Sequence, residues 1–261
     1  MIKLLKVVAA VSLAFAASNA ALADDKLQDI LSDNEIKIGV LSDAAPWGFK
    51  GSDGKLQGLD IDLATLLAKE LGVKLNLVQV TGPSRIPALL SNKVDILIAA
   101  AGATPERAVQ VMFSQPYAAV DLGVYGGDAF AKTENLADLS GKSIAVSKGT
   151  TLDIWLSNNA KDAKIMRFED TPSAIKAYLS GQAQSFAENS AISKKVSDDN
   201  PGKKTELKYL IRQSPAHIMV AQSEQNLLNW INTFLFANRM SGNLAELQKK
   251  WFGQAQNLPT L

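Results

Sequence analysis

Two series of short apolar segments that alternate with amphipathic stretches run through this sequence of 261 residues. The first series includes residues 35–41 and residues 94–101, and the latter segment is nearly all apolar, as a parallel strand covered on both faces requires. A second series opens at Ser143, after a polar stretch from residue 126 to residue 141. This alternation predicts an α/β fold, and two series predict two lobes.

The chain is expected to cross between the lobes near residue 120 and to return near residue 212. The cleft between two such lobes is the default ligand site. Strands are predicted at residues 35–41, 73–80, 94–101, 120–125, 143–146, 164–168, 184–187 and 207–211, and helices at residues 60–71, 87–90, 151–160, 171–180, 223–241 and 243–251.

The first 23 residues have the pattern of a signal peptide. A basic start is followed by an apolar run that ends at Ala17, and Ala21-Leu22-Ala23 offers a small-residue cleavage site before Asp24. A retained membrane anchor is the alternative, but the apolar run is short for one. We therefore predict cleavage after Ala23 and a soluble protein in the periplasm.

Composition excludes several classes of function. The chain has 27 basic and 26 acidic residues, so it has no electrostatic footprint for nucleic acid. It has no cysteine, which excludes disulfides, a lipid-anchored thiol, thiolate metal sites and cysteine nucleophiles. The single histidine, His217, has no metal-ligand spacing around it and is expected to be a partly buried structural residue. No metal and no cofactor is predicted.

Six short motifs occur in order along the mature chain. They are G-L-D-I-D-L-A (58–64), I-P-A-L-L (86–90), T-P-E-R (104–107), F-S-Q-P-Y (113–117), G-T-T (149–151) and K-K-W-F-G (249–253). Together they resemble the signatures of periplasmic solute-binding protein family 3, the type II substrate-binding proteins of polar amino-acid ABC transporters.

The resemblance implies a two-lobed type II periplasmic binding protein fold with two crossover hinge strands. Lobe 1 is expected to hold residues 24–119 and 213–261, and lobe 2 residues 120–212. Such lobes close on a ligand by a hinge motion. The implied partners are a small carboxylate-bearing solute, an amino acid or a related compound, and an inner-membrane ABC permease, with the protein itself a monomer.

Arg107, in T-P-E-R, is the strongest candidate for ligand binding. It follows a buried strand, and its planar guanidinium suits two-pronged capture of a carboxylate. The resemblance assigns the matching arginine to the ligand's α-carboxylate. A surface arginine paired with Glu106 or Glu70 is the alternative.

Other candidates lie on both sides of the expected cleft. Backbone at Ala100 and Gly102 ends the same strand, and Gly102 stands where the family often has a hydroxyl residue. Packing alone is the alternative for both residues. Thr150 and Thr151 open a predicted helix, where a hydroxyl and free N–H groups can meet an anion or serve only as a cap.

An aromatic wall is expected from the loop after the first strand. The family places a stacking aromatic there, but its usual position falls on Ala44 in this sequence. Trp47 is therefore the first candidate and Phe49 the second. Packing in the core is the alternative for both.

Two departures from the family pattern bear on the ligand. The family's acid for the ligand ammonium aligns with Asn189, and strand alternation directs the neighbouring Glu188 away from the cleft, although a shift of one residue would reverse this. Arg85 stands where the family has a small or apolar residue. A cleft with Arg85 and Arg107 and no acid is net positive, which predicts an anionic ligand. The alternative is that Arg85 is solvated or paired with Asp43.

The sequence shows no convincing nucleophile and base pair, so we predict a binding protein and no enzyme. The alternative function is a dehydratase resembling those that act on prephenate or arogenate on the same scaffold. Such an enzyme needs an acid in the site, where Glu188 is the only candidate. Asp60 and Asp62 are interpreted as a helix N-cap and a first-turn acid.

Overall fold

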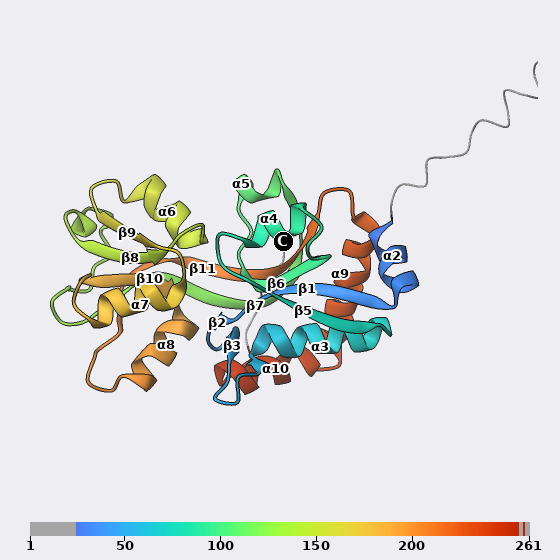
Figure 1. Ribbon diagram of the computed structural model, residues 1–261. Helices are drawn as coiled ribbons and strands as arrows, with labels where there is room; N and C mark the ends of the chain where they lie inside the picture. Colours follow the sequence, from blue (N-terminus) through green and yellow to red (C-terminus); the bar gives the residue numbers. More distant parts are fainter. Residues whose placement is uncertain (1–24, 256–257, 259–261) are drawn as a thin grey trace, which may run out of the picture.

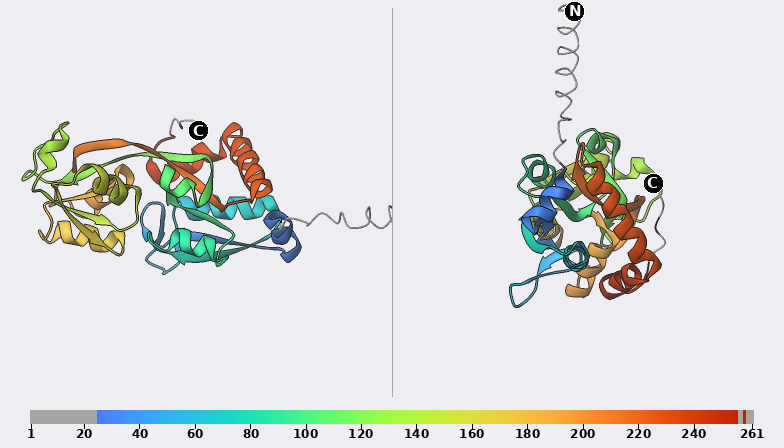
Figure 2. Two further views of the ribbon diagram at one scale, coloured as in Figure 1. Left: turned by 90° about the horizontal axis from the view of Figure 1, so that it is seen from above. Right: turned by 90° about the vertical axis from the view of Figure 1, so that its right-hand side faces the viewer.

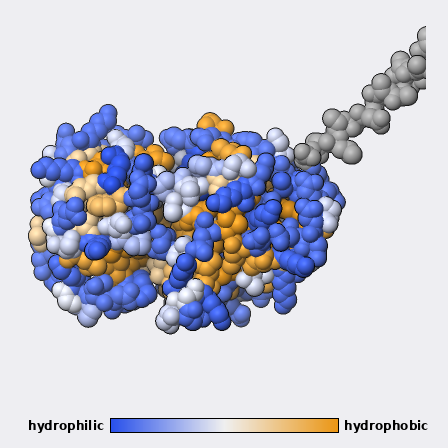
Figure 3. Space-filling view, in the orientation of Figure 1, coloured by the Kyte–Doolittle hydropathy of each residue, from blue (hydrophilic) through white to orange (hydrophobic). Residues whose placement is uncertain are grey.

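Two lobes lie on either side of a waist that is crossed by two long strands in the computed structural model, which describes residues 25–255 and 258 (Figure 1). The crossing strands β7 (Val111–Gly126) and β11 (Glu206–Ala221) pair antiparallel over nearly their whole length. The view from above shows both strands running from one lobe into the other (Figure 2). The molecular surface narrows at the same waist (Figure 3). The two-lobed α/β fold with two crossing strands is thus confirmed.

Both crossing strands extend well beyond the predicted residues 120–125 and 207–211. Their additional residues include Pro116 in β7 and Pro215 in β11, which interrupt the apolar pattern that marks a strand. The predicted lobe boundaries near residues 120 and 212 fall inside these strands, and their positions stay predictions.

One eight-stranded mixed sheet runs through both lobes in the order β5-β1-β6-β11-β7-β10-β8-β9. On each side of the antiparallel central pair the outer strands run parallel to one another. These outer strands are β1 (Glu35–Leu41), β5 (Lys74–Val80) and β6 (Ile96–Ala101) in lobe 1 and β8 (Ser143–Ser147), β9 (Lys164–Phe168) and β10 (Ser185–Asn189) in lobe 2.

Helices cover the sheet in both lobes (Figure 1). Lobe 1 has α2 (Lys26–Asp33), α3 (Leu59–Leu71), α4 (Arg85–Leu90), α5 (Pro105–Ala108), α9 (Gln225–Met240) and α10 (Asn243–Phe252). Lobe 2 has the short 3₁₀ helix η1 (Leu136–Leu139), α6 (Thr151–Asn159), α7 (Thr171–Leu179) and α8 (Ser190–Asp199).

Three of the α-helices, α2, α5 and α8, and the 3₁₀ helix η1 were not expected from the sequence. Helix α8 is mostly polar and buries only Ile192, Ser193 and Val196, so it lacks a broad apolar stripe. Helix α3 begins at Leu59 with Gly58 as its N-cap, so Asp60 is a first-turn residue and not the cap.

A small second sheet carries the loop that holds Trp47. It consists of β2 (Asp43–Ala44), β3 (Gly48–Lys50) and β4 (Leu56–Gln57). Backbone N–H groups at the start of α3 donate to the carbonyls of Pro46 and Trp47 at 3.0 and 2.8 Å. A Cβ on Gly58, whose φ is +132°, would lie 2.1 Å from the Trp47 carbonyl oxygen, so this close approach requires glycine.

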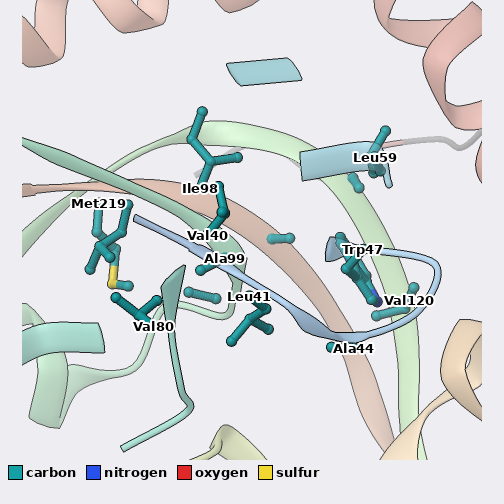
Figure 4. Packing of buried hydrophobic residues seen from close by; sticks show 14 of the residues in the cluster. Val40, Leu41, Ala44, Trp47, Leu59, Val80, Ile98, Ala99, Val120 and Met219 are labelled. Carbon is teal, nitrogen blue, oxygen red and sulfur yellow. The ribbon is translucent and has the colours of Figure 1, made fainter. Parts of the chain in front are cut away.

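The Trp47 side chain consequently lies at the waist, beside Ala44 and Val120 (Figure 4). Among residues 25–255, no helix is long and apolar enough to cross a membrane. The predicted signal peptide lies outside the described residues.

Candidate ligand-binding cleft

A pocket that is partly open to solvent lies between the lobes and is lined by residues of both lobes and of both crossing strands. Seven of the nine predicted site residues line it: Trp47, Arg85, Ala100, Gly102, Thr150, Thr151 and Asn189. Their contact with a ligand stays a prediction. Arg107 borders the pocket, and Phe49 does not reach it.

Arg107 connects the two lobes at the edge of this pocket. Its Nη1 donates to the Gly102 carbonyl at 2.8 Å in lobe 1 and to Thr151 Oγ1 at 3.1 Å in lobe 2, and its Nη2 donates to the Gly149 carbonyl at 2.8 Å. These bonds use three of the five guanidinium N–H groups. The lobes are therefore closed on each other in this structure.

No carboxylate of residues 25–255 forms an ion pair with the guanidinium of Arg107. No ion pair joins it to Glu106 or Glu70 in the described part of the chain, and Glu70 instead accepts from Asn238. Burial, with the charges of Arg85 and Arg212 nearby, lowers the pKa of Arg107. An anion bound beside it would therefore be stabilised.

The start of helix α6 brings two hydroxyls to the cleft. Thr150 is the N-cap: its Oγ1 accepts from the Asp153 N–H at 3.1 Å and donates to the Ser147 carbonyl at 2.8 Å. Thr151 is the first helical residue, and its hydroxyl meets Arg107. The Thr150 hydroxyl therefore caps the helix, whereas the Thr151 hydroxyl takes no part in capping and contacts Arg107 across the cleft.

Gly102 leaves room for a hydroxyl that the sequence did not reveal. A Cβ at this position would lie 2.7 Å from Ser214 Oγ and 3.1 Å from Thr151 Oγ1. Ser214, on β11, is buried and lines the pocket. It therefore offers a hydroxyl close to the place where the family often carries one at position 102. Because Ser214 lies far from Gly102 along the chain, the sequence alone does not show that the two residues are close.

Beneath the pocket, Ala100 is linked to a buried acid. Its N–H donates to the Tyr117 hydroxyl at 3.2 Å, and that hydroxyl donates to Asp60 Oδ1 at 2.8 Å. Asp60 is fully buried and its Oδ2 has no hydrogen-bond partner. Burial raises the pKa of Asp60 to about 7. Asp60 thus supports the pocket floor, a role that its position in a helix start did not indicate.

Of the two candidates for the aromatic wall, Trp47 lines the pocket. This side chain is 1% exposed, packs on Phe252 and Tyr117, and donates from Nε1 to Asn189 Oδ1 at 3.3 Å across the cleft. The expectation for Phe49 is not met, because its ring packs edge to face on Trp251 of α10.

Asn189 and Glu188 differ from the expectation that the Asn189 side chain serves the cleft and the Glu188 side chain points away from it. Asn189 caps α8, and its Oδ1 already accepts from the Ile192 N–H and from Trp47. Glu188 is 7% exposed and lines the pocket, so the prediction that it points away is wrong. The reason is that β10 ends here, where strand alternation gives way to the helix cap.

One oxygen of Glu188 is held in place by its neighbour. Oε2 accepts from the Asn189 N–H at 2.7 Å and from its Nδ2 at 2.9 Å. Oε1 makes no hydrogen bond to any residue that the structure describes. Burial raises the pKa of Glu188 to about 7, against the effects of these bonds and of Arg85. Glu188 therefore keeps one oxygen without a hydrogen bond from the described residues, whereas the side-chain oxygen of Asn189 already accepts two.

Arg85 is neither solvated nor ion-paired. It is 5% exposed, lines the pocket, and donates to the carbonyls of Gly82 and Ala99 at 3.2 and 2.7 Å. Asp43 also lines the pocket, but no ion pair joins the two residues. Burial and Asp170 raise the pKa of Asp43, and Arg85 opposes the shift. Asp43 and Glu188 thus accompany the two arginines at the pocket, and the preference for an anionic ligand stays a prediction.

The ligand-free protein is expected to lose stability as the pH rises from about 5 to about 8. Asp60 and Glu188 have pKa values of about 7 in the fold but titrate near 4 when unfolded. Between these values the folded protein holds more protons than the unfolded chain, so its free energy of unfolding falls with increasing pH. Each carboxyl contributes on the order of 3 kcal/mol to this fall.

Chemical unfolding of the wild type and of Glu188→Gln at both pH values tests this expectation. The variant should lose less stability than the wild type over the range. Asp198→Asn removes an exposed carboxylate paired with Lys194 and should behave as the wild type. An equal loss in Glu188→Gln and the wild type would contradict the raised pKa.

His217 lies outside the pocket lining and is fully buried, with Nδ1 2.7 Å from the Ser114 carbonyl. Burial lowers its pKa. Within the described ranges, no group of three or more His, Cys, Asp or Glu residues could hold a metal ion.

Two lobes joined by crossing strands, closed over a polar pocket, define the class of two-lobed solute-binding proteins. A family model for bacterial extracellular solute-binding proteins, family 3, matches residues 36–254. The chain belongs to this family.

Relatives across the family are named as binding proteins. The chain is 30% identical over 233 residues to the ABC transporter glutamine-binding protein of Bacillus subtilis (strain 168), covering 87% of this chain and 84% of that protein. It is 26% identical over 251 residues to the L-cystine-binding protein of Escherichia coli (strain K12), covering 94% and 93%.

Solved structures agree with this assignment. A mutant of the arginine-binding protein from T. maritima superposes with a TM-score of 0.82 at 30% identity, covering 88% of this chain and 100% of that chain. An ancestral amino acid-binding protein, described as a precursor of cyclohexadienyl dehydratase, gives 0.79 at 31% identity, covering 87% and 99%.

Proposed function

We propose that the protein is the periplasmic substrate-binding component of an ABC importer and that it binds an amino acid or a related small carboxylate between its lobes. It acts as a monomer, after cleavage behind Ala23, and presents its closed form to an inner-membrane permease. The observation that supports this most is the position of Arg107, which joins both lobes beside the pocket and has no anionic partner.

Arg107 suits a ligand carboxylate because its hydrogen bonds within the protein leave two of its N–H groups unused. Its contacts with Thr151 and Gly149 exist only when the lobes are closed, and its two remaining N–H groups are available to a carboxylate at the same place. A ligand that engages Arg107 and the Thr151 hydroxyl contacts both lobes at once. It therefore shifts the population toward the closed state.

The names of the relatives support an amino acid or an amino acid derivative as the ligand. They are described as binding glutamine, L-cystine, arginine and octopine. These compounds share an amino acid head and differ in what is attached to it. Glu188, with one free carboxyl oxygen, and Arg107 supply the two charges that such a head requires in this pocket.

A thermal-shift screen of amino acids and small carboxylates tests the proposal. A ligand at about 100 times its Kd adds about 2.7 kcal/mol to the free energy of unfolding. We expect a shift with at least one amino acid, and calorimetry should give one site per chain. Simple amines without a carboxylate serve as the control and should give no shift. A screen without any amino acid or carboxylate hit would contradict the proposed function.

A second candidate function gains support from Glu188. A dehydratase needs a carboxylic acid aimed into the cleft, and Glu188 lies there with a pKa of about 7. Incubation with prephenate or arogenate, followed by ultraviolet absorbance of an aromatic product, decides between the two. We expect no product, because the proposed role of Glu188 is to pair with a ligand ammonium.

A further inference from the structure

Ala100 has a backbone conformation that residues other than glycine rarely adopt. It lies inside β6, yet its φ is +50°, in the left-handed region. In the described part of the chain, the other non-glycine residues with a positive φ lie in turns or at a helix end: Asn34, Asn92 and Ser223. Alanine offers no polar group that stabilises this conformation, so neighbouring residues must hold it in place.

A bulge in β6 brings Ala100 to the pocket. Between two of the pairs that join β6 to β11, residues 98–100 lie opposite Ile218 alone. Such a bulge bends the strand and re-aims a side chain, and bulges are frequent beside functional sites. Ala99 is fully buried in the core (Figure 4), whereas Ala100 lines the pocket. The conformation of Ala100 therefore shapes the floor of the pocket.

The N–H group of Ala100 is held from beneath by two fully buried side chains. It donates to the Tyr117 hydroxyl at 3.2 Å, and this hydroxyl donates to Asp60 Oδ1 at 2.8 Å. Tyr117 comes from β7 and Asp60 from the first turn of α3, and both are 0% exposed. The bond that holds Ala100 is thus anchored in the core and does not depend on a ligand.

The backbone on either side of Ala100 is fixed as well. Arg85 Nη1 donates to the Ala99 carbonyl at 2.7 Å, and Arg107 Nη1 donates to the Gly102 carbonyl at 2.8 Å. Together with the bond from beneath, these contacts hold the end of β6 at three points. A backbone held in this way is preorganised, so little conformational freedom is lost when a ligand binds.

We propose that Asp60 and Tyr117 are positioning residues for ligand binding, which act through the Ala100 N–H and hold the bulge of β6 in the strained conformation that forms the pocket floor. Neither side chain is among the residues that line the pocket, so both act without touching the ligand. This inference rests on the proposed function, since it concerns the affinity of the same site.

Tyr117→Phe tests the inference, because it removes the hydroxyl and keeps the ring that packs on Trp47. The probe is whichever compound among the standard amino acids, L-cystine and succinate binds the wild type most tightly. We expect calorimetry to give a Kd about tenfold higher for the variant, since Ala100 can then leave its strained conformation. Chemical unfolding measures the loss of stability separately. Tyr178→Phe removes a buried hydroxyl that donates to the Lys204 carbonyl, far from the pocket lining, and should bind as the wild type.

Two variants of Asp60 test the other member of the pair. Asp60→Leu removes the acceptor of the Tyr117 hydroxyl and should raise the Kd about as much as Tyr117→Phe does. Asp60→Asn keeps an oxygen that can accept from this hydroxyl, so its Kd should stay within about threefold of the wild type. A folded Asp60→Asn that binds as weakly as Tyr117→Phe would contradict a role through this hydrogen bond.

Ala100→Gly distinguishes positioning from a general loss of packing. Glycine adopts a φ of +50° without strain, so it needs no side chain to hold it there. In the Tyr117→Phe background we expect Ala100→Gly to lower the Kd again by about threefold or more, whereas alone it should change the Kd little. A folded Tyr117→Phe with the Kd of the wild type, or no recovery with Ala100→Gly, would overturn the inference and leave the proposed function standing. A wild type that binds none of the compounds would overturn both.

Discussion

Replacement of Arg107 by glutamine is expected to weaken ligand binding by at least about a hundredfold. The guanidinium has two N–H groups left for a carboxylate and connects Gly102 in lobe 1 with Thr151 in lobe 2. Charge-assisted hydrogen bonds contribute roughly 1.5–3 kcal/mol each. The variant loses these bonds to the ligand together with the contact that closes the lobes. Calorimetry with the tightest ligand from the screen measures the effect.

Arg107→Lys is the matched control for this prediction. It keeps the positive charge and loses the planar fork, so its Kd should lie between those of the wild type and of Arg107→Gln. The ligand-free melting temperature of both variants shows whether the fold is intact. A Kd within threefold of the wild type in a folded Arg107→Gln would contradict the role of Arg107.

Replacement of Gly102 by valine is expected to prevent full closure of the lobes. The added Cβ would lie 2.7 Å from Ser214 Oγ and 3.1 Å from Thr151 Oγ1, and the two methyl groups need further space. Overpacking costs about 1–3 kcal/mol, which corresponds to roughly a fivefold to 150-fold weaker Kd. Calorimetry measures the Kd, and small-angle scattering measures the compaction on ligand addition.

Two further variants separate this effect from a general loss of packing. Ser214→Ala in the Gly102→Val background removes the nearest atom and should recover part of the affinity. Gly202→Val makes the same change where no heavy atom lies within 4 Å and should bind as the wild type. Unchanged affinity in Gly102→Val would show that the ligand-bound lobes do not meet at this glycine.

The sequence predicts the architecture well because alternating apolar strands and helices record which faces are buried. It predicts the crossing strands only in part, since Pro116 and Pro215 conceal the ends of β7 and β11. It also misses helix α8, whose few buried residues do not form a recognisable stripe. Such features depend on tertiary packing more than on local pattern.

The site residues, too, can be predicted where they belong to a local motif and not where tertiary packing brings them to the pocket. Arg107 and Thr151 belong to local motifs, and their meeting across the cleft could be expected from the order of the motifs. The position of Glu188 could not, because a strand end and a helix cap coincide at Asn189 and both side chains reach the pocket. Ser214 carries no local signal at all, since only the folded chain brings it to the pocket.

In the proposed mechanism, a ligand bound between the lobes holds them closed. The chain has no cysteine, so Lys93→Cys in lobe 1 and Lys161→Cys in lobe 2 provide two unique exposed positions for spin labels. Pulsed electron–electron double resonance then measures the distance between the lobes. We expect a broad or longer distribution without ligand and a single shorter one at saturation. An unchanged distribution with a ligand that calorimetry shows to be bound would contradict the account.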